Sequence, residues 1–93
     1  MAEREYVWTD EGLNDARRNK VELNEVAQAL YAPSGLRFER RIGAVLLVVM
    51  GMADSARVVA VLCDRVETTT TYKIVAARAL GGPELDEWRR RVS

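Results

Sequence analysis

Hydrophobic positions concentrate in two short runs near the middle of the chain, Ala44–Met50 and Val58–Cys63. Both runs are rich in β-branched residues, and the polar segment Gly51–Arg57 lies between them. This pattern predicts two neighbouring strands of a hairpin. Because both runs are apolar on both faces, we expect central strands that helices cover on at least one side.

Weaker patterns on either side of this hairpin predict the remaining elements. Before it we expect a short strand at Glu5–Trp8, a helix from about Asp10 to Asn19, a helix over Glu22–Tyr31 and an outer strand at Leu36–Ile42. After it we expect a strand at Tyr72–Ala77 and a short helix that opens at Pro83 and ends near Arg90. The order β-α-α-β-β-β-β-α predicts one α+β domain over residues 1–93, with helices packed against an antiparallel sheet.

The last predicted strand carries the most suggestive single residue, Arg78. Strict alternation places Tyr72, Ile74, Ala76 and Arg78 on one face. Arg78 also lies close to Gly81–Gly82, where a strand ends and a cleft often opens. The alternative is an edge arginine that covers Tyr72 or pairs with a carboxylate.

The charge balance restricts where a polyanion could bind. Lys plus Arg and Asp plus Glu number 14 each, so the formal net charge is zero. A nucleic-acid site must therefore be a local patch. If the first helix packs near the outer strand, one patch could contain Arg17, Arg18, Lys20, Arg37, Arg40 and Arg41. The alternative is a set of solvated side chains balanced by Glu22, Glu25 and Glu39.

Several function classes are excluded by what the composition lacks. The chain has no histidine, which excludes Ser-His-Asp and Cys-His catalysis and argues against a zinc site. The single cysteine, Cys63, cannot form an intramolecular disulfide and suits a reducing cytoplasm. The N-terminus does not read as a signal peptide, and no apolar run reaches the ~18 residues of a membrane span. We therefore expect a cytoplasmic protein that does not associate with membranes.

The succession of short motifs resembles the BrnT-like toxin family. The motifs are an aromatic opening, a basic helix end, an acidic helix, a turn arginine before an apolar strand, a closing strand and a charged C-terminal helix. They are found at Tyr6–Asp10, Arg18–Val21, Asn24–Leu30, Ala56–Arg57, Ile74–Ala79 and Glu84–Arg90. The resemblance covers roughly residues 6–90 and rests on the order and spacing of the motifs.

This resemblance implies a RelE-like fold and a bacterial endoribonuclease, the toxin of a type II toxin–antitoxin pair, which a cognate antitoxin inhibits. Arg18 and Arg78 match basic positions of the family motifs, and Arg57 matches the turn arginine. As catalytic residues they would stabilise charge on phosphorus during attack by the RNA 2′-hydroxyl, without a metal ion or cofactor. The residues expected to contact the RNA backbone are Arg17, Lys20, Arg40 and Arg41.

Two departures from the family pattern support a second hypothesis. Asn19 stands where the family usually has histidine, and Ala76 stands where it often has serine. The missing histidine, the zero net charge and the acidic C-terminal helix favour a catalytically silent RelE-fold module that binds a partner protein through its sheet edge. A third hypothesis is a homodimer joined through outer strands or the C-terminal helix.

Overall fold

A computed structural model describes residues 3–92 as an α+β structure, so the predicted fold class is confirmed. Its elements in chain order are β1 (Glu5–Trp8), α1 (Asp10–Arg18), α2 (Leu23–Leu30), a short 3-10 turn η1 (Ser34–Leu36), β2 (Arg37–Ile42), β3 (Leu46–Met52), β4 (Val58–Arg65), β5 (Thr71–Ala79) and α3 (Gly82–Val92). Within the described residues no helix is long and apolar enough to cross a membrane.

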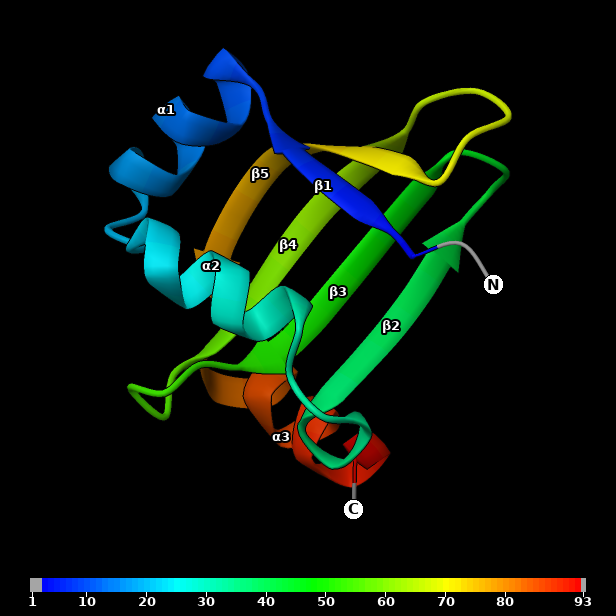
Figure 1. Cartoon of the computed structure of the whole chain (residues 1–93). Coiled ribbons are helices and arrows are strands. Elements are labelled where there is room, and N and C mark those ends of the chain that lie inside the picture. Colours follow the sequence, from blue (N-terminus) through cyan, green and yellow to red (C-terminus); the bar gives the residue numbers. More distant parts are fainter. Residues whose placement is uncertain (1–2, 93) are drawn as a thin grey trace.

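The five strands form one sheet in the order β1-β5-β4-β3-β2 (Figure 1). Strands β2 to β5 are antiparallel neighbours, as predicted, and β3 and β4 form the central hairpin. Strand β1, however, runs parallel to β5. The prediction of a wholly antiparallel sheet was therefore wrong for β1. The direction of β1 relative to β5 depends on the path of the chain through α1 and α2, which a local sequence pattern does not reveal.

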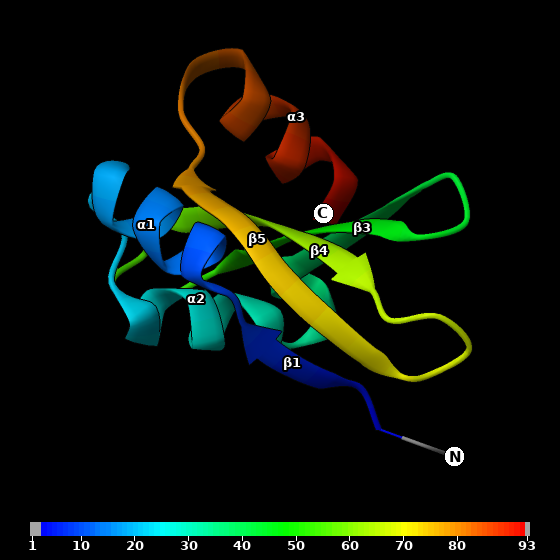
Figure 2. The ribbon, with the colours of Figure 1, turned by 90° about the horizontal axis from the view of Figure 1, so that it is seen from above.

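Helices cover the two faces of the sheet unequally (Figure 2). One face, called here the α1/α2 face, carries the main core, whose largest fully buried members include Leu47, Val49, Val61 and Ile74. The other face, called here the α3 face, carries a smaller cluster of buried residues, Val58, Ala60, Leu80 and Trp88. Helix α3 lies over only one end of that face, so the rest stays open.

Near the end of β5, side chains from α1 and its C-terminal end form the hydrogen bonds that a neighbouring strand would otherwise form. Strand β1 ends opposite Ile74, so the next part of β5 has no strand on that side. There the Asp15 Oδ2 atom accepts a bond from the Ala77 N–H (2.9 Å), and the Asn19 side chain donates to the Ala77 carbonyl (2.9 Å). Thr9 caps α1 and donates to the Ile74 carbonyl (2.7 Å). These bonds satisfy backbone groups that would otherwise lack partners.

A register shift in β5 changes which side chains share a face. Leu62 of β4 lies opposite Ala76, whereas the next residue, Cys63, lies opposite Ile74, so one residue of β5 is extra. Beyond this irregularity Ala77 is buried in the main core, and Arg78 projects from the α3 face. The prediction that Arg78 shares a face with Tyr72 and Ile74 was therefore wrong, because one extra residue reverses the alternation.

Candidate functional site

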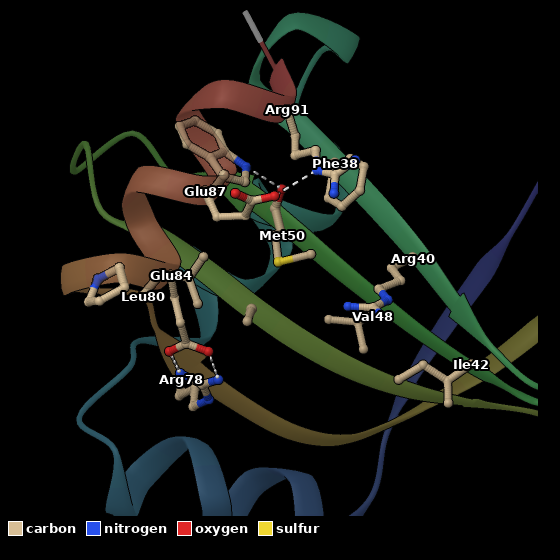
Figure 3. Close-up of a pocket in the computed structure, with 13 residues that line it drawn as sticks. Phe38, Arg40, Ile42, Val48, Met50, Arg78, Leu80, Glu84, Glu87 and Arg91 are labelled. Carbon is tan, nitrogen blue, oxygen red and sulfur yellow. Dashed lines mark hydrogen bonds and ion pairs between the residues drawn. The ribbon is translucent and has the colours of Figure 1, made fainter.

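A hollow of about 650 Å³ lies between α3 and the open part of the α3 face (Figure 3). We call it the α3 groove. Its apolar lining comes from four elements and the chain before α3, and consists of Phe38, Ile42, Val48, Met50, Ala60, Leu80, Pro83 and Trp88. Its charged lining consists of Arg40, Arg78, Glu84, Glu87 and Arg91. The groove thus combines an apolar floor with charged walls.

Trp88 fixes α3 in place beside this groove. Its side chain is buried, and its indole N–H donates to the Met50 carbonyl on β3 at 2.8 Å. Leu85 and Val92 of the same helix pack against the same cluster. The spacing of these three residues places them on one side of α3, which turns its charged residues toward the groove and the solvent.

Arg78 is held by Glu84, a residue of the first turn of α3. The two side chains form a double hydrogen bond, with N–O distances of 2.7 and 2.6 Å. This bond raises the pKa of Arg78 and lowers the pKa of Glu84. Both groups therefore stay ionised near neutral pH, and neither is suited to transfer a proton. The alternative raised for Arg78, a pairing with a carboxylate, is what the structure contains.

The other two arginines of the groove differ in their contacts. Arg91 lies 5.7 Å from the centre of the Phe38 ring and bonds to Glu87 at 2.9 Å. Arg40 is exposed on β2, and within residues 3–92 no ion pair or hydrogen bond engages its side chain. Arg40 is thus the cation of the groove that can accept a new anionic partner.

A second group of cations surrounds the junction of α1 and α2. Arg17 and Lys20 line a hollow of about 340 Å³ there. Arg57, from the turn between β3 and β4, donates to the Lys20 carbonyl at 3.2 Å and to Glu25 at 3.0 Å. Arg18 is largely exposed and lies 3.5 Å from Asp15. We call Arg17, Arg18, Lys20 and Arg57 the basic corner.

The six-residue patch expected from the sequence does not form. Helix α1 packs on β5, whereas β2 lies at the far edge of the sheet. On β2 the side chains also divide between the faces: Arg40 lines the α3 groove, while Arg41 reaches the Tyr72 hydroxyl (3.5 Å) on the α1/α2 face. The predicted patch was wrong because the sheet order separates α1 from β2.

The three arginines expected to be catalytic lie near one end of β4 and β5 but turn in different directions. Arg57 directly precedes β4, Arg78 is near the end of β5, and α1 bonds to Ala77 just before Arg78. Each is next to its own carboxylate: Asp15 beside Arg18, Glu25 beside Arg57 and Glu84 beside Arg78. The α3 groove is lined by Arg78 but by neither Arg18 nor Arg57.

Glu25 organises the contact between α2 and the β3–β4 turn, and the sequence analysis had treated it only as a counter-charge. It is buried, with 6% of its surface exposed. It accepts bonds from the Ser55 hydroxyl (2.6 Å), the Glu22 N–H (3.0 Å) and Arg57 (3.0 Å). The Glu-x-x-Glu spacing at the start of α2 indicates the bond from the Glu22 N–H to the Glu25 side chain, which caps the helix. The contacts of Glu25 with Ser55 and Arg57 depend on tertiary structure.

Replacing Glu25 by glutamine should lower stability at neutral pH and change its pH dependence. The Ser55 bond, the Glu22 backbone bond and the Arg57 charge together lower the pKa of Glu25 below 4.5. Its contribution is therefore complete above pH 4.5 and is lost as the pH falls through the lower, folded-state pKa. We expect a cost of about 1–3 kcal/mol at pH 7. Urea unfolding from pH 2 to 7 measures it.

The control for this measurement is Glu67→Gln, at an exposed position in the turn after β4. We expect this variant to keep the wild-type pH profile. An equal loss of stability for Glu25→Gln at pH 2 and pH 7 would contradict the role assigned to the ionised carboxylate.

Cys63 has no role in either site. It is fully buried in the main core, and burial raises its pKa to about 12. The thiolate needed for nucleophilic attack is therefore scarce at neutral pH.

No protein-family model matches this chain, and no curated protein matches it significantly.

Proposed function

We propose that this protein acts by binding a partner protein, and that the partner docks in the α3 groove. On the strength of the sequence resemblance, it would be a catalytically silent BrnT-like protein with a RelE-like fold. The partner would then be the cognate antitoxin. The observation that carries the proposal is the open apolar floor beside Arg40, a cation without a counter-ion in the described structure.

The chemistry of the groove specifies the partner's docking segment. Ile42 is 47% exposed, and Phe38, Val48 and Met50 are only partly buried, so apolar side chains of a partner would remove them from water. Arg40 in the wall of the groove would pair with a carboxylate of the partner. The segment should therefore be amphipathic, with apolar residues on one side and an acidic residue beside them.

The contacts of Arg18, Arg57 and Arg78, the three motif arginines, favour binding over catalysis. Each already neutralises a carboxylate, and the carboxylate of Glu84 has a lowered pKa, which makes it a weak base. Cleavage by the 2′-hydroxyl requires a group that accepts its proton. The pKa values of Glu25 and Glu84 are both lowered, so neither carboxylate is suited to that task while its arginine is in place.

The test uses the product of the adjacent reading frame as the binding partner. Calorimetric titration should give at least a tenfold weaker affinity for Arg40→Glu than for the wild type, since the substitution places a second anion beside the partner's carboxylate. Arg17→Glu, in the basic corner on the α1/α2 side, is the matched charge reversal and should bind normally. Equal affinities for wild type and Arg40→Glu would reject the groove as the docking site.

The second candidate function is the endoribonuclease toxin. Within residues 3–92 the side chains of Arg17 and Lys20 have no ion-pair partner, and with Arg18 and Arg57 they form a basic corner suited to a phosphate backbone. The three motif arginines point in different directions, so they would have to turn toward one phosphate after RNA displaces their carboxylates. They would then stabilise the charge that develops on phosphorus.

Induction in a bacterial host separates the two candidates. As a toxin, the wild type should arrest growth and fragment messages, and Arg78→Ala should do neither. As a binding module, both proteins should leave growth and messages intact. Purified wild-type protein that cleaves RNA alone would exclude the silent module.

A further inference from the structure

Strand β2 leaves one edge of the sheet open. It is the last strand in the order β1-β5-β4-β3-β2 and pairs only with β3 (Figure 1). Within the described part of the chain, no backbone–backbone bond beyond that ladder involves residues 38–42. The outward N–H and C=O groups of β2 can therefore pair with another strand.

Exposed hydrophobic side chains gather along this edge. Among the described residues, five large hydrophobic side chains are exposed, and four of them lie at or near β2. Leu36 (39% exposed) precedes the strand, Ile42 (47%) ends it, and Val45 (50%) follows in the turn to β3. Tyr31 (65%) shares a hollow with Arg37 and Glu39 of β2. Apolar exposure concentrated at an open edge is typical of an interface.

We propose that β2 pairs antiparallel with β2 of a second copy of this chain, about a twofold axis at Arg40. Side chains that face each other across an antiparallel pair lie on the same face of the sheet. With the axis at Arg40, Phe38 lies opposite Ile42 of the second copy on the α3 face. Glu39, which pairs with Arg4 (2.6 Å) and Arg37 (3.3 Å) of its own chain, lies opposite Arg41 of the second copy on the α1/α2 face. Symmetry repeats both pairs, which gives two apolar and two oppositely charged pairs.

The charge sequence of β2 selects this register over its neighbours. An axis at Glu39 would place Glu39 opposite itself and Arg37 opposite Arg41, which are like charges. An axis at Arg41 would place Arg41 opposite itself and Glu39 opposite Gly43. Like charges directly opposite each other are destabilising. The axis at Arg40 has one such pair, Arg40 with its own copy, and both of its neighbouring pairs are complementary.

The dimer would join the two α3 grooves on one continuous face, because Phe38, Arg40 and Ile42 line the groove. This inference does not depend on the proposed partner, since the dimer can form whether or not the groove binds one.

Engineered cysteines test the register directly. In Arg40→Cys, the two new thiols would lie across the axis at a Cα separation of about 4.5–5.5 Å, which a disulfide spans. In the control Arg41→Cys, the Cα atoms of the two cysteines would be about 8 Å apart, because the two positions are offset from each other by two residues along the strand pair. Mild oxidation should cross-link the first variant and not the second. Cys63 does not compete, because it is fully buried.

Sedimentation of the untreated protein tests the dimer itself. The wild type should shift from monomer to dimer as its concentration rises. Ile42→Asp should weaken dimerisation about tenfold or more, whereas Leu23→Asp, at the similarly exposed hydrophobic residue at the start of α2, should not. A wild type that stays monomeric would overturn the proposal. A dimer that ignores Ile42→Asp, or that cross-links through position 41 instead of 40, would also overturn it.

Discussion

Replacing Trp88 by alanine should lower the free energy of unfolding by about 3–5 kcal/mol, the range for removing a buried aromatic side chain. Trp88 is 3% exposed and supplies both the apolar contact of α3 and its bond to the Met50 carbonyl. Loss of this contact should also free α3 from the sheet and open the α3 groove. Urea unfolding monitored by circular dichroism measures the stability loss.

The control for this experiment is Trp88→Phe, which keeps most of the apolar contact and removes the indole N–H. We expect it to cost about 1–3 kcal/mol, since the Met50 carbonyl loses a partner in a partly buried site and some volume is lost. If Trp88→Ala were no worse than Trp88→Phe, the apolar contact could not be what holds α3.

Gly51→Ala should be the second severe substitution. A Cβ atom at Gly51 would lie 2.2 Å from the Ala29 carbonyl oxygen and 2.9 Å from the Ala29 Cα. These are backbone atoms of α2, so no rotamer change relieves the clash, and α2 must move away from β3. We expect a loss of about 3 kcal/mol, the upper part of the usual overpacking range. In thermal unfolding this corresponds to a Tm lower by about 12–24 °C.

Gly35→Ala is the matched control for this prediction. A Cβ atom at Gly35 would meet no heavy atom within 4 Å, and Gly35 does not have a positive φ. We expect no loss of stability, because the substitution only restricts the unfolded chain. A Gly51→Ala protein as stable as Gly35→Ala would mean that α2 is not tightly packed on β3.

These contacts matter for function because they define the α3 groove. Trp88 sets the position of one wall, and the Arg78–Glu84 pair joins that wall to β5. A partner that competes for either contact would change the groove when it binds. Binding measurements on Trp88 variants must therefore be read together with their stability.

The sequence predicted which site residues lie close together but not where their side chains point, because spacing along a chain does not fix directions in space. The sequence motifs led to Arg18, Arg57 and Arg78, and the fold brings all three near one end of β4 and β5. It then turns each toward a different carboxylate. Those carboxylates belong to α1, α2 and α3, and their approach depends on how each helix packs. The separation of Arg40 from Arg41 follows from strand alternation, but the distance of β2 from α1 does not.

The pattern of apolar residues determined the central β3–β4 hairpin and the α+β class, because a run of β-branched residues restricts local conformation and must be buried. The sequence also indicated both N-terminal helices and the C-terminal helix, whose predicted start at Pro83 lies one residue after the observed start at Gly82. Only the tertiary structure decided the parallel pairing of β1, the extra residue in β5 and the burial of Glu25. Each of these features depends on contacts between residues far apart in the chain. The free energies of such contacts cannot be inferred from a short segment of sequence.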